Sequence, residues 1–278
     1  MPVQPPPPVS LPDLVAAFRQ TAEEVLALGR SCSEADWARP TECPGWTVQD
    51  QLAHVSALES GLAGEPQPRV ELPDLPHVRS EFGRFMELGV HARRSWSGPE
   101  VVDELARVLP VRVAALSDPS LTLDTVIESR LGPRPAGAFV ALRTRDIWCH
   151  EQDLRVALGR PLTLAAPGGA LFADGVLAAV PAVLARDVHA PVGTSVVVEV
   201  TGEVVGSVGA RVEAGEGGIP RGVAVDPAEV AEPTARITLT TEAITRRGAG
   251  RRSVADTPYA ASGDLALAAA LLEALAIT

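Results

Sequence analysis

The chain has 278 residues, of which 46% are apolar, and it carries a formal net charge of −11. Nucleic-acid binding depends on Lys and Arg side chains that neutralise phosphates, so this acidic balance argues against DNA or RNA as partners. All 24 basic residues are Arg, which excludes chemistry that needs a lysine amine. Because hydrophobic cores usually divide beyond roughly 250 residues, we predict two domains.

The cysteines and the start of the chain predict a cytoplasmic protein. Cys32, Cys43 and Cys149 are an odd set without the spacing of a disulfide framework or a zinc knuckle, which fits reduced thiols. The first ten residues, MPVQPPPPVS, lack the basic and apolar parts of a secretion signal, and no uninterrupted apolar stretch of about 18 residues occurs in the sequence. We therefore predict a disordered proline-rich tail over residues 1–9 and no membrane span.

Helical patterns dominate the chain up to about residue 162. Ser10 and Thr47 are typical N-cap residues, with Asp13 and Asp50 in the first turns that follow. Pro110 is expected to bend or break the helix that contains it. The predicted helices span residues 10–29, 47–62, 75–94, 100–116 and 136–158. An extended segment over residues 121–131 precedes the last of these helices, and Gly159 is expected to end it.

The pattern changes after about residue 165. Short β-branched runs separated by Gly and Pro predict strands at residues 195–200, 209–213 and 236–240. Apolar periodic stretches predict helices at residues 170–184 and 264–275. Strands flanked by helices are typical of a small α+β domain. We therefore predict a helical bundle over residues 10–162 and an α+β domain over residues 163–278.

One pair of polar residues lies on the apolar side of the long helix at 136–158. Asp146 and His150 are four residues apart, so their Cβ atoms lie about 5–6 Å apart on one helix face. Asp153 follows on the same face. An unpaired buried carboxylate costs several kcal/mol. Either Arg143, on the same face, or a bound cation must therefore compensate the acidic side chains.

A third ligand can come from a facing helix, as in the metal sites of other bundle cores. His54 lies near the edge of the apolar face of the helix at 47–62 and is the best candidate. The alternative is a core histidine that hydrogen-bonds Asp50. His77, His91 and His189 have no comparable setting, so we predict that they are structural.

Two sequence segments resemble the mycothiol-dependent maleylpyruvate isomerase family. They are RPTECPGWTVQDQLAH, which ends at His54, and RTRDIWCHEQDLRVALG, which begins at Arg143. The resemblance implies a DinB-like four-helix bundle whose metal ligands are His54, Asp146 and His150. The family usually has Glu where this chain has Asp146. Two His and one carboxylate suit zinc, which we favour, and also Fe(II). The end of the chain resembles the family's sterol-carrier-like C-terminal domain.

The resemblance also implies an activity. Three protein ligands leave a coordination position open, which is typical of a catalytic site. The thiol implied is mycothiol of actinobacteria, which would lose its proton at the metal and add to a small electrophile, giving cis–trans isomerisation or S-transfer. An anionic substrate would need an arginine clamp. The candidates are Arg246, Arg247 and Arg251, together with Arg252, although a solvated basic turn explains most of such a cluster.

Other functions remain open at this point. The same fold could hold a metal or an apolar ligand without turnover, or it could regulate another protein. A regulatory role predicts a protein-sized apolar patch instead of a cleft. We expect a monomer or a small homo-oligomer whose partners are the electrophile and the low-molecular-weight thiol.

Overall fold

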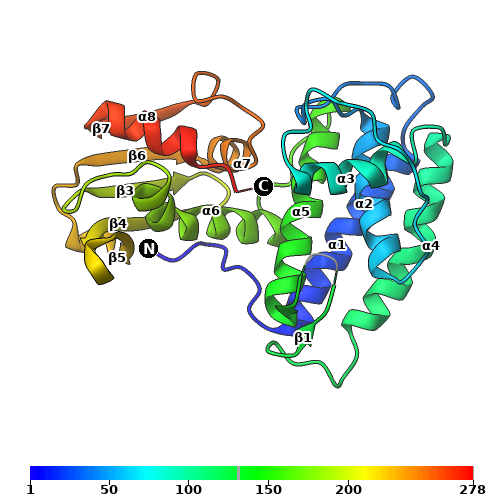
Figure 1. Cartoon of the computed structure of the whole chain (residues 1–278), viewed down its shortest axis with the longest axis horizontal. Helices are drawn as coiled ribbons and strands as arrows, with labels where there is room; N and C mark the ends of the chain where they lie inside the picture. Colours follow the sequence, from blue (N-terminus) through cyan, green and yellow to red (C-terminus); the bar gives the residue numbers. More distant parts are fainter. Residues whose placement is uncertain (130–131, 278) are drawn as a thin grey trace. The chain divides into compact units, whose positions relative to one another are not determined.

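The computed structural model describes residues 1–129 and 132–277, and the chain divides into two compact units (Figure 1). The helical unit is Pro8–Leu162. The second unit is Thr163–Thr278 together with Met1–Pro7. The predicted mixture of helices and strands is confirmed, because a helical bundle precedes a mixed sheet with its own helices.

A four-helix bundle makes up most of the helical unit. α1 contacts α4 and α5, and α2 contacts the same two helices, so the four surround one core, while α3 packs on α2 (Figure 1). A two-stranded hairpin, β1 with β2, lies ahead of α5. The elements of this unit are α1 (Leu11–Arg30), α2 (Val48–Leu62), α3 (Glu81–His91), α4 (Gly98–Leu116), β1 (Val126–Ile127), β2 (Arg134–Pro135) and α5 (Ala136–Ala157).

The helix ends follow their capping residues. The Ser10 hydroxyl accepts a hydrogen bond from the backbone N–H of Asp13, as predicted. Thr47 and Asp50 form a reciprocal capping box at the start of α2. Gly159 has a φ of 64°, which confirms that it ends α5. Of the predicted bend or break at Pro110, the break does not occur, since α4 is continuous from Gly98 to Leu116.

The second unit is a five-stranded sheet with three helices. The strand order is β5-β4-β3-β6-β7, in which β3 and β6 are parallel and the other neighbours are antiparallel. Its elements are α6 (Pro167–Arg186), β3 (Ser195–Thr201), β4 (Gly206–Ala214), β5 (Pro220–Val225), β6 (Ala235–Thr240), α7 (Thr241–Gly248), β7 (Tyr259–Gly263) and α8 (Leu265–Ala274). The sequence prediction lacked β5, α7 and β7, which are short and have weak hydrophobic patterns.

The first residues of the chain differ from the predicted disordered tail. The backbone of Gln4 exchanges two hydrogen bonds with Val205, of 2.7 and 2.8 Å, and the Met1 carbonyl accepts one from Ser207. Val3 is buried beside Gly206. Pro cannot donate a backbone hydrogen bond, but Val3 and Gln4 precede the proline run and retain their backbone N–H groups. Val3 also supplies an apolar side chain that can be buried. Residues 1–4 are therefore held against residues 205–207 of the second unit.

α6 is long and apolar enough to cross a membrane, and among the described helices of at least 18 residues it alone is so. Of its most apolar window, 72% is buried inside the fold. It contacts β4 and β5, so its apolar composition is that of a helix covering a sheet.

Candidate metal centre

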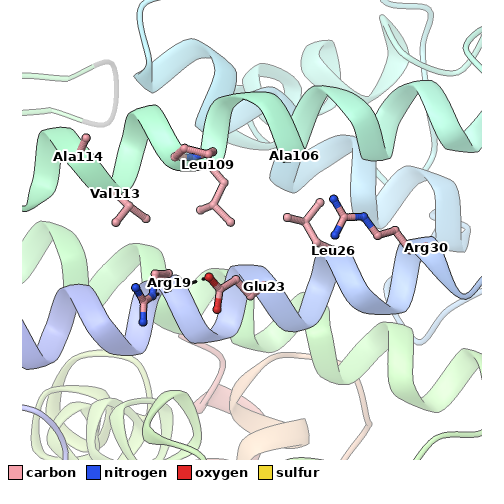
Figure 2. Close-up of a pocket in the computed structure, with 9 residues that line it drawn as sticks. Arg19, Glu23, Leu26, Arg30, Ala106, Leu109, Val113 and Ala114 are labelled. Carbon is pink, nitrogen blue, oxygen red and sulfur yellow. Dashed lines mark ion pairs between the residues drawn. The ribbon is translucent and has the colours of Figure 1, made fainter.

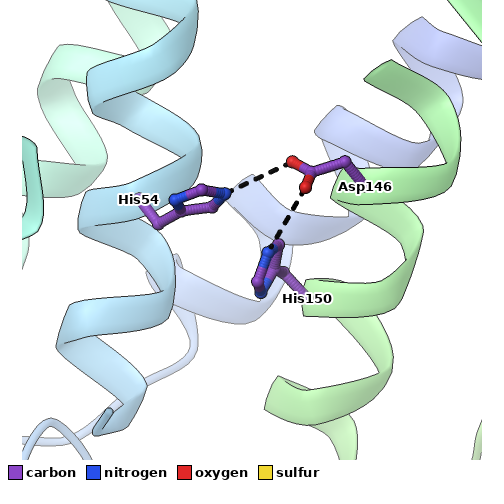
Figure 3. A group of neighbouring side chains, drawn as sticks. All are labelled: His54, Asp146 and His150. Carbon is purple, nitrogen blue, oxygen red and sulfur yellow. Dashed lines mark hydrogen bonds and ion pairs between the residues drawn. The ribbon is translucent and has the colours of Figure 1, made fainter. Parts of the chain in front are cut away.

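Two helices of the bundle bring together the three residues that the sequence analysis singles out. His54 lies on α2, and Asp146 and His150 lie one turn apart on α5 (Figure 3). His54 Nε2 is 3.3 Å from Asp146 Oδ2, and His150 Nε2 is 3.7 Å from Asp146 Oδ1. One potential ligand atom from each residue lies within 4.8 Å of the others. The carboxylate therefore stands between two imidazole nitrogens.

Burial and charge set the protonation of this cluster. The His54 side chain is 4% exposed, and burial together with the nearby His150 lowers its pKa to about 4, so the ring is neutral at pH 7. Burial opposes ionisation of Asp146, but the Arg143 guanidinium outweighs it and, with His54, holds the pKa of this carboxyl well below its usual range. A neutral imidazole and an ionised carboxylate are the forms that bind metals.

A hydrogen-bond network behind His150 fixes the direction of its ring. The Gln51 Oε1 accepts a hydrogen bond from His150 Nδ1. The Gln51 amide nitrogen donates to Thr41 Oγ1 at 2.8 Å and to Asp153 Oδ2 at 3.2 Å. With Nδ1 as the donor, the lone pair of His150 is on Nε2, which is the nitrogen that faces Asp146. Gln51 is fully buried. Its role was not predicted, because nothing in the sequence indicates that Gln51 on one helix meets His150 on another.

Asp153 lies beside this network. Its Oδ2 is 3.6 Å from His150 Nδ1. From the sequence, Asp153 is expected to pair with Arg143 or Arg155, and the alternative is an acid that orients a metal-ligating histidine. In the structure, Arg143 binds Glu59 and Asp146, and Arg155 binds Glu24 and Glu151. The position of Asp153 therefore agrees better with the alternative, an acid that orients a histidine from behind.

A chain of buried charges holds Asp146. Arg143 Nη1 donates to Asp146 Oδ2 at 2.9 Å, and the same guanidinium binds Glu59 Oε1. Glu59 also accepts from Arg112 Nε at 2.8 Å. Asp146 is 28% exposed and is paired with Arg143, so of the two predicted ways to compensate its charge, Arg143 or a bound cation, the structure shows the first. The two arginines and two acids balance, and the argument for a metal rests on the histidines instead.

Trp46 covers the two histidine rings. Its ring centroid is 4.9 Å from that of His54 and 5.7 Å from that of His150. The indole N–H donates to Glu87 at 2.8 Å, and this buried acid also binds Arg94. The indole therefore packs against both imidazole rings.

Among the described residues of the helical unit, two cavities bear on the site. One, of about 700 Å³, includes His54 and opens between α2, α3 and residues 64–70. The other, of about 490 Å³, is a groove between α1 and α4, where Leu26 faces Leu109 and Val113 (Figure 2). Arg19 and Glu23 form an exposed ion pair at its side. Only the first cavity reaches one of the three clustered residues.

The arginines predicted to bind substrate belong to the second unit. Arg246 and Arg247 are buried in α7, not part of a solvated turn. The Arg247 guanidinium donates to the backbone carbonyls of Leu272, Glu273 and Arg252, which ties α7 to the end of α8. Arg251 donates to the Ala249 carbonyl. These contacts give Arg247 a structural task, and the catalytic role of Arg246, Arg247 and Arg251 stays a prediction.

The donor set fits a divalent ion. Ligands about 2.1 Å from a tetrahedral zinc ion lie about 3.4 Å from one another. The two His–Asp146 distances, 3.3 and 3.7 Å, are close to this value but end on different carboxylate oxygens, and one potential ligand atom from each of the three residues lies within 4.8 Å of the others. Among the described residues, the buried His54 Nδ1 has no hydrogen-bond partner. The helical unit is thus a four-helix bundle with a two-histidine, one-carboxylate cluster.

The helical unit belongs to a known domain family. Residues 18–155 match the family model described as the mycothiol maleylpyruvate isomerase N-terminal domain. Two uncharacterized proteins of Mycobacterium tuberculosis, from strains H37Rv and CDC 1551, are each 29% identical over 165 residues. That similarity covers 54% of this chain and 58% of each relative, so the chain matches a little over half the length of these relatives.

Solved structures share the fold over nearly the whole chain. The crystal structure of the mycothiol-dependent maleylpyruvate isomerase has a TM-score of 0.57 and 15% identity. A mutant of that enzyme gives the same TM-score with 14% identity. Each comparison covers 91% of this chain and 93% of the other. At this identity the likeness establishes the fold alone.

Proposed function

We propose that this chain is a metal-dependent enzyme that uses a low-molecular-weight thiol, mycothiol, to attack a small electrophile. The observation that carries the proposal is the convergence of His54, Asp146 and His150 beside a cavity that one of them lines. Membership of the isomerase domain family supports the choice of thiol. The reaction is a cis–trans isomerisation or an S-transfer, and the acidic, cysteine-poor chain suits the cytoplasm.

The roles of the residues follow from their contacts. His54, Asp146 and His150 would hold the ion, for which we favour zinc. A divalent ion there would lower the pKa of a bound thiol and so supply a thiolate nucleophile. Gln51 keeps the His150 ring in one orientation, and Arg143 keeps the Asp146 carboxylate between the histidines. Trp46 packs against both imidazole rings.

Metal removal tests the proposal. The purified protein is expected to contain about one divalent ion per chain by elemental mass spectrometry. Chelation should abolish the consumption of mycothiol in the presence of an electrophile, and zinc should restore it. Stoichiometric metal without any thiol consumption would favour the alternative, a metal- or apolar-ligand-binding protein. Absence of metal from protein that also binds no added zinc would contradict the proposed site.

Gln51 offers a test of the network behind His150. The Gln51→Leu variant removes the acceptor of the His150 Nδ1 hydrogen bond and leaves the three ligands in place. Loss of such a support typically weakens metal affinity about 10- to 100-fold. Competition with a chromophoric chelator measures the zinc affinity directly.

Gln49 provides the matched control on the same helix. Its side-chain amide donates to the carbonyl of Trp96, away from the histidines. Gln49→Leu should therefore leave zinc affinity within about twofold, although it removes a hydrogen bond as well. Equal losses in the two variants would mean that Gln51 acts only through the stability of α2.

A further inference from the structure

The cavity beside His54 has the size of a small-molecule site. Its volume of about 700 Å³ falls in the range of roughly 300–1,000 Å³ that is usual for ligand pockets. α2 lines it with residues spaced three and four apart, which form one stripe of the helix. These residues are His54, Ala57, Leu58, Gly61 and Leu62. The stripe connects the cavity directly to the proposed metal centre.

The opposite wall is apolar as well. α3 contributes the half-buried side chains of Phe85, Met86 and Leu88. The segment after α2 adds Pro66, Pro68 and Val70. Apolar walls on both sides of the cavity favour a ligand with an apolar body. Binding of such a ligand removes the apolar surface of the ligand and of the cavity walls from water.

The charged residues of the cavity do not make a clamp for a dianion. Arg93 is fully buried, and its guanidinium already binds both carboxylate oxygens of Glu104, at 2.5 and 2.6 Å. It also donates to the Gly89 carbonyl. Arg69 and Glu128 are exposed and of opposite charge. Among the described lining residues, Arg69 is the one cation without an ion pair, and it can meet one carboxylate. A second carboxylate placed between α2 and α3 would lose its hydration without a further free cation from these residues.

We infer that the electrophile is an apolar molecule with at most one charged end, whose body lies between α2 and α3 and whose reactive carbon lies beside His54. This inference rests on the proposed function, which it extends to a substrate class. An α,β-unsaturated carbonyl compound with an alkyl tail fits the description. Thiol addition forms one S–C bond at the β-carbon and delivers the thiol proton to the α-carbon, so the reaction needs no leaving group and no oxidant.

A series of electrophiles tests the substrate class. The zinc-loaded full chain is assayed with mycothiol and with 2-butenal, 2-hexenal or 2-octenal, and with maleate as the dicarboxylate. Each buried methylene is expected to raise kcat/KM by up to about fourfold. From 2-butenal to 2-octenal we expect a rise of more than about tenfold, with maleate slower than 2-octenal. Equal rates along the series, or maleate as the best substrate, would overturn the inference.

Two phenylalanines on α3 give a matched pair of variants. Phe85 lines the cavity, whereas Phe82 is 64% exposed and does not belong to its lining. Phe85→Gln should weaken the binding of 1-octanol, measured by calorimetry, about tenfold, and Phe82→Gln should leave it within about twofold. The same titrations on zinc-free protein give a readout that does not depend on turnover. If both variants bind like the unchanged chain, the apolar body does not lie on α3.

These experiments distinguish failure of the proposed function from failure of the proposed substrate class. If no electrophile consumes thiol in a zinc-dependent reaction while octanol still binds next to Phe85, the proposed function is wrong. If zinc-dependent consumption occurs but shows neither the chain-length preference nor the Phe85 effect, the function stands and the apolar substrate class is wrong.

Discussion

Replacing His150 with Ala is expected to abolish stoichiometric metal binding. His150 supplies one of three ligands, and its Nε2 lone pair is the one that its hydrogen bond to Gln51 directs towards Asp146. Two ligands from different helices hold an ion far less tightly than three. We expect zinc affinity to fall by more than about 100-fold, beyond the effect of losing a supporting hydrogen bond. Elemental analysis and chelator competition measure the loss.

His91 is the matched control for this substitution. It lies in the last turn of α3 in the same unit, and it is not part of the cluster of His54, Asp146 and His150. His91→Ala should retain about one zinc ion per chain with unchanged affinity. Metal content that stays the same in His150→Ala, or falls equally in His91→Ala, would contradict the assignment of His150 as a ligand.

Replacing Glu59 with Gln is expected to give the largest loss of stability. Glu59 is fully buried and is shared by Arg112 and Arg143, whose side chains are 7% and 2% exposed. Gln preserves the size of the side chain and removes the charge, which leaves two buried guanidinium groups facing one remaining acid, Asp146. Removing one member of a buried ion pair costs about 3–5 kcal/mol. The free energy of unfolding should fall by this amount.

Urea unfolding monitored by tryptophan fluorescence measures this loss of stability in the helical unit. All four Trp residues of the chain belong to the helical unit. Glu23→Gln is the control, because the Arg19–Glu23 ion pair has both side chains 59% exposed. An exposed pair contributes at most about 1 kcal/mol. A loss below this value in Glu59→Gln would mean that the buried charge chain does not support the bundle.

Local signals in the sequence determined much of the bundle. Ser10, Thr47 and Gly159 were identified as helix ends, since caps depend on neighbouring residues alone. The helix spacing of Asp146 and His150 predicted their common face. The pairing with His54 came mainly from a family resemblance, because no local rule tells which residues of two helices will meet.

The interior of α5 was harder to predict from its periodicity. Glu151 and Gln152 are polar residues, yet both are buried. Glu151 binds Arg155, which reaches Glu24 on α1. α5 is enclosed by α1 and α2, so polar residues on several of its sides find buried partners. A hydrophobic pattern that assumes one buried and one solvent-exposed face cannot describe such a helix.

The sequence by itself determined the helix ends, the α+β class and the residue types of a candidate metal site, because each depends on residues that are close in the chain. Only the tertiary structure decided the partners of those residues. In the tertiary structure Gln51 accepts a hydrogen bond from His150, Arg143 binds Asp146, and an apolar cavity lies next to His54. These contacts depend on how α2, α3 and α5 pack, and the energy of a buried polar group depends on the partner that packing supplies.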